Sequence, residues 1–128
     1  MLWVRAGGLL SETAFRDGLA AILEKSFGVE VVNINDDDEG VVFGRPDQVE
    51  LDILIKNGLL IACEIKSSMD KAGLYIFSRK VDFYERKHQR KANRRLVITP
   101  FLDPRTAAIP EKLSIEVLYT DPTQIRVD

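Results

Sequence analysis

The stretch that most constrains the fold is residues 49–66, which read VELDILIKNGLLIACEIK. Two apolar-rich runs flank Asn57-Gly58, and an Asn-Gly pair between such runs is the strongest short-range signal of a β-hairpin. Asp52, Glu64 and Lys66 lie among isoleucines and leucines in these runs, where a charged side chain is costly unless it has a function. The segment therefore predicts two antiparallel strands that carry functional charges.

The pairing register of this hairpin determines which charges share a face, because opposed residues point the same way and faces alternate along a strand. A two-residue turn at Asn57-Gly58 would place Asp52 opposite Cys63 and send Asp52 and Glu64 to opposite faces. A three-residue loop, starting at Asn57 or one residue earlier, would leave one face wholly apolar. Since apolar alternation fixes the register where one face is buried, we expect a three-residue loop that places Asp52, Glu64 and Lys66 on one face.

Two carboxylates and a lysine on one sheet face predict a metal-dependent phosphodiesterase site. Asp52 and Glu64 offer hard oxygen ligands that suit Mg²⁺, which keeps coordination positions for water and phosphate; we expect Mn²⁺ to substitute. The carbonyl of Ile65 is a further candidate ligand. A bound ion would polarise a phosphoryl oxygen and activate a water, while Lys66 would orient that water or stabilise negative charge. The alternative interpretation is a pair of ordinary cross-strand salt bridges.

The order of these elements resembles a known family. Asp52, a short hairpin, the triplet Glu64-Ile65-Lys66 and a following basic helix are similar to the PD-(D/E)xK nuclease superfamily, in particular to small archaeal members that resemble Holliday-junction resolvases. The resemblance covers residues 12–119 and implies that Asp52 and Glu64 bind the metal and that Lys66 is catalytic. Glu12 matches an acidic residue that many members carry in the first helix, although the helix dipole explains an acid there equally well.

The remaining pattern agrees with a restriction-endonuclease-like α/β fold, with an αβββαβ core and a mixed central sheet flanked by helices. Ser11 and Gly28 are suitable caps for a first helix with apolar residues at helical spacing. The expected elements after it are a strand at 29–35 that resumes at 41–43 after an acidic turn at 36–40, the hairpin, a helix from about 70 to 91, a strand at 96–99, a short helix at 103–112 and a strand at 114–119.

The second predicted helix contains most of a concentrated basic segment. Residues 79–95 hold eight Lys and Arg but only two acidic residues, a formal charge of +6, so the rest of the chain carries −8. Beside a phosphodiesterase site, such a segment predicts a nucleic-acid-binding surface; the alternative is a solvated helix with cations near its C-terminus. The residues assigned to this surface are Arg79, Lys80, Tyr84, Arg86, Lys87 and Arg90.

Length and composition narrow the class of protein. A chain of 128 residues is expected to form one domain over residues 1–128. No segment approaches the ~20 apolar residues of a membrane span, so no membrane partner is expected. The single cysteine, Cys63, excludes an intramolecular disulfide, falls on the predicted apolar face as a buried thiol, and suits a reducing cytoplasm.

These observations lead to one principal hypothesis and one alternative. We expect an Mg²⁺-dependent endonuclease that hydrolyses phosphodiester bonds, with DNA as the expected substrate. The alternative is a catalytically silent module on the nuclease fold that binds nucleic acid or serves in assembly. The likeness to resolvases also makes a homodimer an expectation.

Overall fold

The computed structural model describes residues 11–120. Its elements are, in chain order, α1 (Glu12–Phe27), β1 (Glu30–Asp38), β2 (Asp47–Lys56), β3 (Leu59–Ile65), α2 (Lys71–His88), β4 (Arg94–Thr99), the 3₁₀ helix η1 (Pro104–Thr106), α3 (Ile109–Lys112) and β5 (Glu116–Tyr119). The strands form one sheet in the order β1-β2-β3-β4-β5, antiparallel from β1 to β3 and parallel from β3 to β5. The predicted αβββαβ order and mixed sheet are confirmed.

The helix ends follow from local capping chemistry. The side chain of Ser11 accepts a hydrogen bond from the amide of Ala14, and Gly28 ends α1 in the left-handed conformation with φ of 64°, as predicted. Asp70 caps α2 in the same way, but α2 ends at His88 because Gln89 adopts a φ of 53°, three residues before the predicted end. None of the helices within residues 11–120 is both long and apolar enough to span a membrane.

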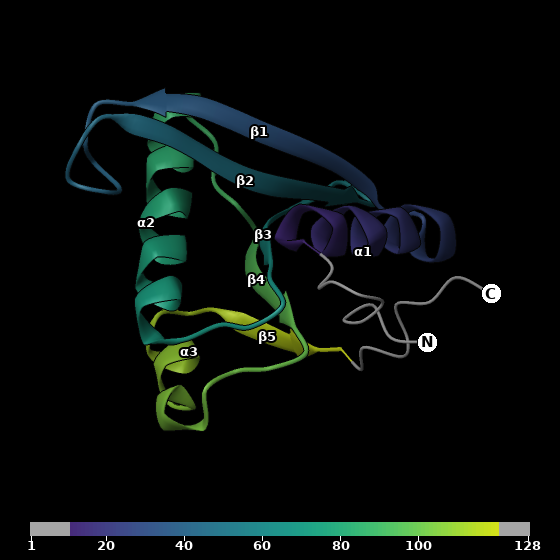
Figure 1. Cartoon of the computed structure of the whole chain (residues 1–128). Coiled ribbons are helices and arrows are strands. Elements are labelled where there is room, and N and C mark those ends of the chain that lie inside the picture. The colour runs from purple at the N-terminus through teal and green to yellow at the C-terminus, as the bar shows by residue number, and fades with distance from the viewer. Residues whose placement is uncertain (1–10, 121–128) are drawn as a thin grey trace.

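The two long helices cover opposite faces of the sheet (Figure 1). On the α1 face, Phe15 of α1 packs with Leu54 of β2 and Cys63 of β3. On the α2 face, Phe77 of α2 packs with Ile53 of the same strand β2. Cys63 is fully buried and free, as predicted, and burial raises the pKa of its thiol well above the usual value.

The register of the central hairpin differs from the prediction. Lys56 pairs with Leu59 and Asp52 pairs with Cys63, so the loop is the two-residue turn that the prediction rejected. Asn57 and Gly58 both have positive φ, 52° and 79°, as a type I′ hairpin turn requires. The prediction assumed one apolar face, whereas helices bury both faces of this sheet, so alternation of apolar residues did not determine the register.

The acidic segment after β1 is also more ordered than predicted. Residues 36–38 continue β1 instead of forming a solvated turn, and residues 41–43 lie in the turn instead of resuming the strand. Asp38 is 4% exposed, and its carboxylate accepts hydrogen bonds from the amides of Gly40, Val41 and Val42 at 2.9–3.2 Å. These bonds lower the pKa of the Asp38 carboxyl against the opposing effect of burial, so Asp38 organises the β1–β2 loop.

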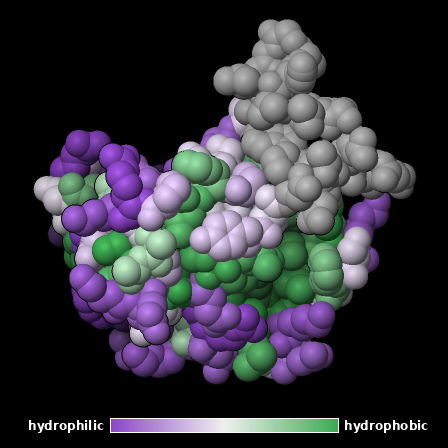
Figure 2. All heavy atoms as spheres, turned by 90° about the horizontal axis from the view of Figure 1, so that it is seen from below, coloured by the Kyte–Doolittle hydropathy of each residue, from purple (hydrophilic) through white to green (hydrophobic). Residues whose placement is uncertain are grey.

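Apolar side chains remain at the surface where α1 approaches β5. Leu118 and Tyr119 of β5 are exposed, as is Phe27 at the end of α1, and all three line an apolar groove with Ile22. Figure 2 shows apolar surface on the side of the molecule that is seen from below.

Candidate active site

A cavity opens where β2 and β3 separate. Asp52 and Cys63 are the last pair between these strands. Residues 47–51 of β2, which come before Asp52, pair with β1. Glu64 and Ile65 of β3, which come after Cys63, pair with β4. The strands therefore diverge, and a cavity of about 250 Å³ lies at the point of divergence, lined by residues of α1, β2, β3 and α2.

The charged residues of the predicted site line this cavity, although they do not share a sheet face. Asp52 lies on the α1 face and Glu64 on the α2 face, as the pairing of Asp52 with Cys63 requires. The prediction that they share one face is therefore wrong. Both still border the cavity, as does Lys66, because the gap between the diverging strands is open to side chains from both faces.

Asp52 is held by two neighbours that the sequence did not predict. Arg16 of α1 donates from Nε to Oδ2 at 2.9 Å and from Nη2 to Oδ1, and Asn33 of β1 donates from Nδ2 to Oδ1 at 2.9 Å. Asp52 is only 5% exposed, and the pairing raises the pKa of the Arg16 guanidinium above its usual value. One feature of the sequence could have pointed to Arg16 as a residue of the site. Arg16 lies four residues after the candidate site residue Glu12, and therefore on the same side of a helix.

Glu64 is paired from the other side of the sheet. Lys80 of α2 donates from Nζ to Oε1 of Glu64 at 3.2 Å, and both side chains are largely buried. Burial raises the pKa of the Glu64 carboxyl, the nearby charges of Lys80 and Lys66 oppose that rise, and the charge of Asp52 adds to it. Lys80, predicted to bind nucleic acid, therefore points into the cavity.

The backbone of Ile65 faces the gap between the strands. The amide of Lys66 donates to the carbonyl of Ile98 in β4 at 3.0 Å. The peptide bonds of the described residues are trans, and in a planar trans peptide the carbonyl of one residue points opposite to the amide of the next. The Ile65 carbonyl therefore points away from β4 and toward β2, where the cavity lies.

Glu12 lines the same cavity but already has a structural contact. Its carboxylate accepts hydrogen bonds from the amide and the hydroxyl of Ser67, both at 2.7 Å. Glu12 thus ties the first turn of α1 to the segment that directly follows Lys66. This contact is a third explanation for the acid, beside the helix dipole and a role at a metal.

The basic segment is divided between the fold and the surface. Tyr84 is 4% exposed and packs in the α2-face core, so the prediction that it faces nucleic acid is corrected. Arg79 donates to the carbonyl of Val42 at 3.0 Å and Lys87 lies over the ring of Phe83. Arg79 and Lys87 are exposed, as are Arg86 and Arg90.

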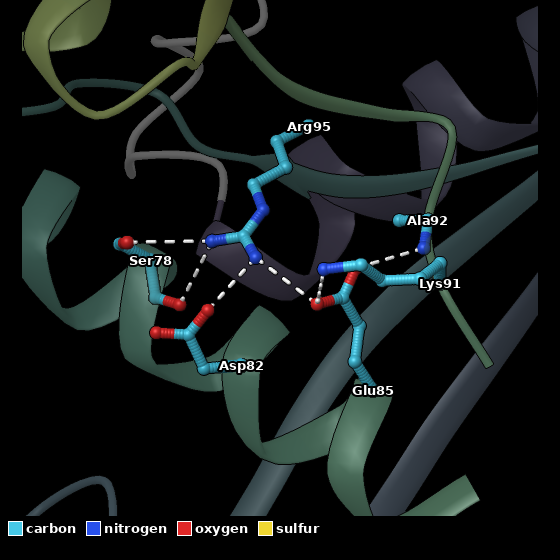
Figure 3. Close-up of polar contacts among 6 residues, drawn as sticks. All are labelled: Ser78, Asp82, Glu85, Lys91, Ala92 and Arg95. Carbon is cyan, nitrogen blue, oxygen red and sulfur yellow. Dashed lines mark hydrogen bonds and ion pairs between the residues drawn. The ribbon is translucent and has the colours of Figure 1, made fainter. Parts of the chain in front are cut away.

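A further part of the positive charge is used within the fold. The guanidinium of Arg95 in β4 donates to Asp82 at 2.8 Å and to Glu85 at 3.2 Å, both on α2 (Figure 3). The exposed cations therefore form a smaller basic surface than the formal charge of the segment suggests.

The donor set of the cavity suits a divalent cation of the Mg²⁺ type. The cavity is lined by five carboxylates against three cations, an excess of two negative charges; these residues are Glu12, Asp17, Glu50, Asp52, Glu64, Arg16, Lys66 and Lys80. No group of three His, Cys, Asp or Glu residues within residues 11–120 is placed to hold a metal. Mg²⁺ commonly uses only one or two carboxylates and completes its shell with water and phosphate oxygens, so two carboxylates and a carbonyl fit it.

Comparison with solved structures gives the fold family. The structure resembles a repair endonuclease from Pyrococcus abyssi, with 18% identity and a TM-score of 0.56 over 91% of this chain and 50% of that chain. It also resembles EndoMS in its apo form, with 13% identity and a TM-score of 0.58 over 90% of this chain and 49% of that one. The chain thus spans about half the length of these structures. At these identities the likeness concerns the restriction-endonuclease-like fold.

Comparison of sequences gives the family. A family model described as the PD-(D/E)XK nuclease superfamily matches residues 47–116, which include the whole hairpin, α2 and β4. A model of a family of unknown function matches residues 7–46. No curated protein gives a significant match. Since residues 47–116 are more than half of the sequence, the chain belongs to the PD-(D/E)XK nuclease superfamily.

Proposed function

We propose that this chain is a divalent-metal-dependent endonuclease that hydrolyses phosphodiester bonds in DNA. One observation carries the proposal: Asp52, Glu64 and Lys66, which stand in the order of the family motif, line one cavity at the divergence of β2 and β3. Asp52, Glu64 and the carbonyl of Ile65 would hold Mg²⁺ or Mn²⁺. A bound divalent ion supplies Lewis-acid polarisation and lowers the pKa of a coordinated water.

The residues of the chain would provide the remaining parts of the site. Lys66 is close enough to Glu64 to oppose the rise of its pKa, and its ammonium would stabilise the negative charge that develops on a phosphate at the cavity. Glu12 would keep Lys66 in place through its two bonds to Ser67. Burial of Asp52 and Glu64 limits access of bulk water, which strengthens these electrostatic interactions.

Nucleic acid is the substrate that fits the cations of α2. Lys80 borders the cavity itself, and Arg79, Arg86, Lys87 and Arg90 are exposed on α2 and just after it, where they would bind phosphates. The description of one structural relative as a repair endonuclease favours DNA over RNA. The apolar side chains of β5 and α1 (Figure 2) are a candidate interface for a homodimer.

The proposal is tested by cleavage of linear, nicked and branched DNA in Mg²⁺ or Mn²⁺, with EDTA as the metal-free control. Lys66→Met should lower the rate at least about 100-fold, in the range that loss of one stabilising charge produces, and Glu64→Gln should do the same. Lys112→Met is the matched control, because Lys112 is an exposed lysine of α3. Cleavage that survives both cavity substitutions would refute the proposed site.

One observation favours the alternative of a catalytically silent nucleic-acid-binding module. Both oxygens of Asp52 already accept hydrogen bonds from Arg16 and Asn33, so most of the lone pairs of the carboxylate are occupied in this arrangement. This alternative predicts DNA binding with a steep salt dependence but no metal-dependent turnover. Fluorescence anisotropy with labelled DNA, combined with the cleavage assay, separates the two functions.

A further inference from the structure

Arg16 lies on the carboxylate that the proposed function assigns to a metal. Its guanidinium binds both oxygens of Asp52, in the bidentate arrangement that gives the strongest charge-assisted hydrogen bonds. Asn33 binds one of the same oxygens at 2.9 Å. A carboxylate offers about four lone-pair sites, and these three bonds leave only the second site of Oδ2 open. A divalent cation that takes the lone pairs facing Arg16, or both oxygens, must displace the guanidinium.

We propose that Arg16 and the divalent metal compete for Asp52, so that Arg16 is a positioning residue that sets the metal affinity of the cavity. The inference rests on the proposed function, because it takes Asp52 as a metal ligand. In the metal-free chain, Arg16 neutralises a carboxylate that is 5% exposed and would otherwise be an unpaired charge in the sheet. The same contact lowers the affinity of the cavity for a cation.

Arg16 has a second partner that would receive it after displacement. Its Nη1 donates to Oδ1 of Asp17 at 2.8 Å, and the Asp17 side chain is 59% exposed while that of Arg16 is 22% exposed. The guanidinium can therefore leave Asp52 and remain paired at the mouth of the cavity. Since Asp17 also lines the cavity, the positive charge would stay beside the site, where a phosphate oxygen is a suitable partner for the guanidinium.

Lys80 does not impose the same competition on Glu64. Lys80 makes one contact with Glu64, to Oε1 at 3.2 Å, and an ammonium is a point charge without the fixed fork of a guanidinium. A carboxylate contacted at one oxygen can coordinate a cation through the other. Removal of Arg16 is therefore the substitution expected to change metal affinity most among the cations of the cavity.

The test is the affinity of the full chain for Mn²⁺ alone, measured by electron paramagnetic resonance of the free ion. Arg16→Ala should bind Mn²⁺ at least about tenfold more tightly than the wild type, a typical size for coupling between two binding events. Arg94→Ala is the matched control, because Arg94 forms a bidentate pair with Glu116 away from the cavity; it should change the affinity less than about twofold. Asp52→Asn should abolish the binding.

Chemical rescue distinguishes competition from a merely structural role. Guanidinium ion at millimolar concentration should weaken Mn²⁺ binding to Arg16→Ala, because it can enter the space that the side chain leaves, and should not affect the wild type. Urea, which has a similar shape but no charge, should have no effect on either protein. If circular dichroism shows that Arg16→Ala does not fold, Arg16→Lys replaces it; the lysine keeps the charge but not the fork, so its Mn²⁺ affinity should lie above that of the wild type.

The outcomes separate this inference from the proposed function. Unchanged or weaker Mn²⁺ binding in Arg16→Ala (or Arg16→Lys, if it replaces it), together with loss of binding in Asp52→Asn, would overturn the competition and leave the metal site intact. Absence of millimolar Mn²⁺ binding in the wild type and in both Arg16 variants would overturn the metal site and the inference together.

Discussion

The stability of the metal-free domain should depend strongly on the Arg16–Asp52 pair. In Arg16→Met, which keeps an apolar stem of similar length, Asp52 loses both guanidinium bonds but keeps the bond from Asn33. Hydrogen bonds to charged groups contribute about 1.5–3 kcal/mol net, and the partial exposure of Arg16 lets water recover some of the loss. We expect a fall of about 2–3 kcal/mol in the free energy of unfolding.

A second bidentate pair in the same chain provides the comparison. Arg94 donates to Glu116 at 2.8 and 2.6 Å, but these side chains are 46% and 50% exposed. An exposed pair of this kind contributes about 0–1 kcal/mol, so Arg94→Met should cost under about 1 kcal/mol. The two substitutions remove the same charge and the same number of bonds to the paired carboxylate. Arg16 also loses its bond to the exposed Asp17, so the main difference between the two pairs is burial.

Urea denaturation followed by circular dichroism in EDTA measures both costs under conditions in which no metal stabilises the folded state. A difference of about 2 kcal/mol should also appear as a difference of about 6–8 °C in the midpoint of thermal unfolding for a domain of this size. Equal costs for Arg16→Met and Arg94→Met would refute the view that burial makes the Asp52 pair strong.

Three further outcomes follow from the structure. Burial raises the pKa of Glu64 above its ordinary value of 4.5, so the folded state binds that proton more tightly than the unfolded state does. The wild type should therefore lose stability relative to Glu64→Gln as the pH rises above 4.5. The midpoints of urea denaturation at each pH measure this difference. Gly58→Ala should cost about 1–2 kcal/mol because of the positive φ, although there is room for the added Cβ; no loss in urea denaturation would contradict the type I′ turn. Arg86→Ala and Arg90→Ala should each lower the slope of log affinity against log salt by about 1 in fluorescence anisotropy with duplex DNA; unchanged slopes would remove these residues from the binding surface.

The parts of the fold that depend on local chemistry were predictable from the sequence. Ser11 and Gly28 define α1, and Asp70 defines the start of α2, because a side-chain cap or a left-handed residue acts on the backbone within a few positions. The order of helices and strands followed from these signals and from apolar spacing. The predicted end of α2 was three residues too late, because Gln89 adopts a left-handed φ of 53° and glutamine carries no sequence signal for that conformation.

The register of the hairpin could not be obtained from apolar alternation. In β2, Ile53 packs on the α2 face and Leu54 on the α1 face, so apolar residues occupy both sides of the strand. A one-residue change of register then exchanges one apolar face for another, and the energetic preference that alternation supplies is lost. The turn residues Asn57 and Gly58, which both accept positive φ, were the better guide.

The contacts of the site were beyond local patterns because they join distant segments. Arg16 and Asp52 are 36 positions apart, and Lys80 and Glu64 are 16 apart. Each pair depends on how a helix packs against the sheet, which sequence spacing does not specify. The residues of the motif could be proposed from sequence, but the cations that neutralise them could not.

The divergence of β2 and β3 explains why Asp52 and Glu64 line one cavity although the predicted register was wrong. Where the strands are paired, the sheet separates side chains on the α1 face from side chains on the α2 face. Asp52 and Glu64, which lie on opposite faces, can therefore border one space only where pairing stops. Pairing stops directly after Asp52 and Cys63, one residue before Glu64. Each carboxylate then meets a cation from the helix on its own face, Arg16 from α1 and Lys80 from α2. The charge of the cavity is therefore set by both helical layers, and a substitution in either helix can change its affinity for a cation.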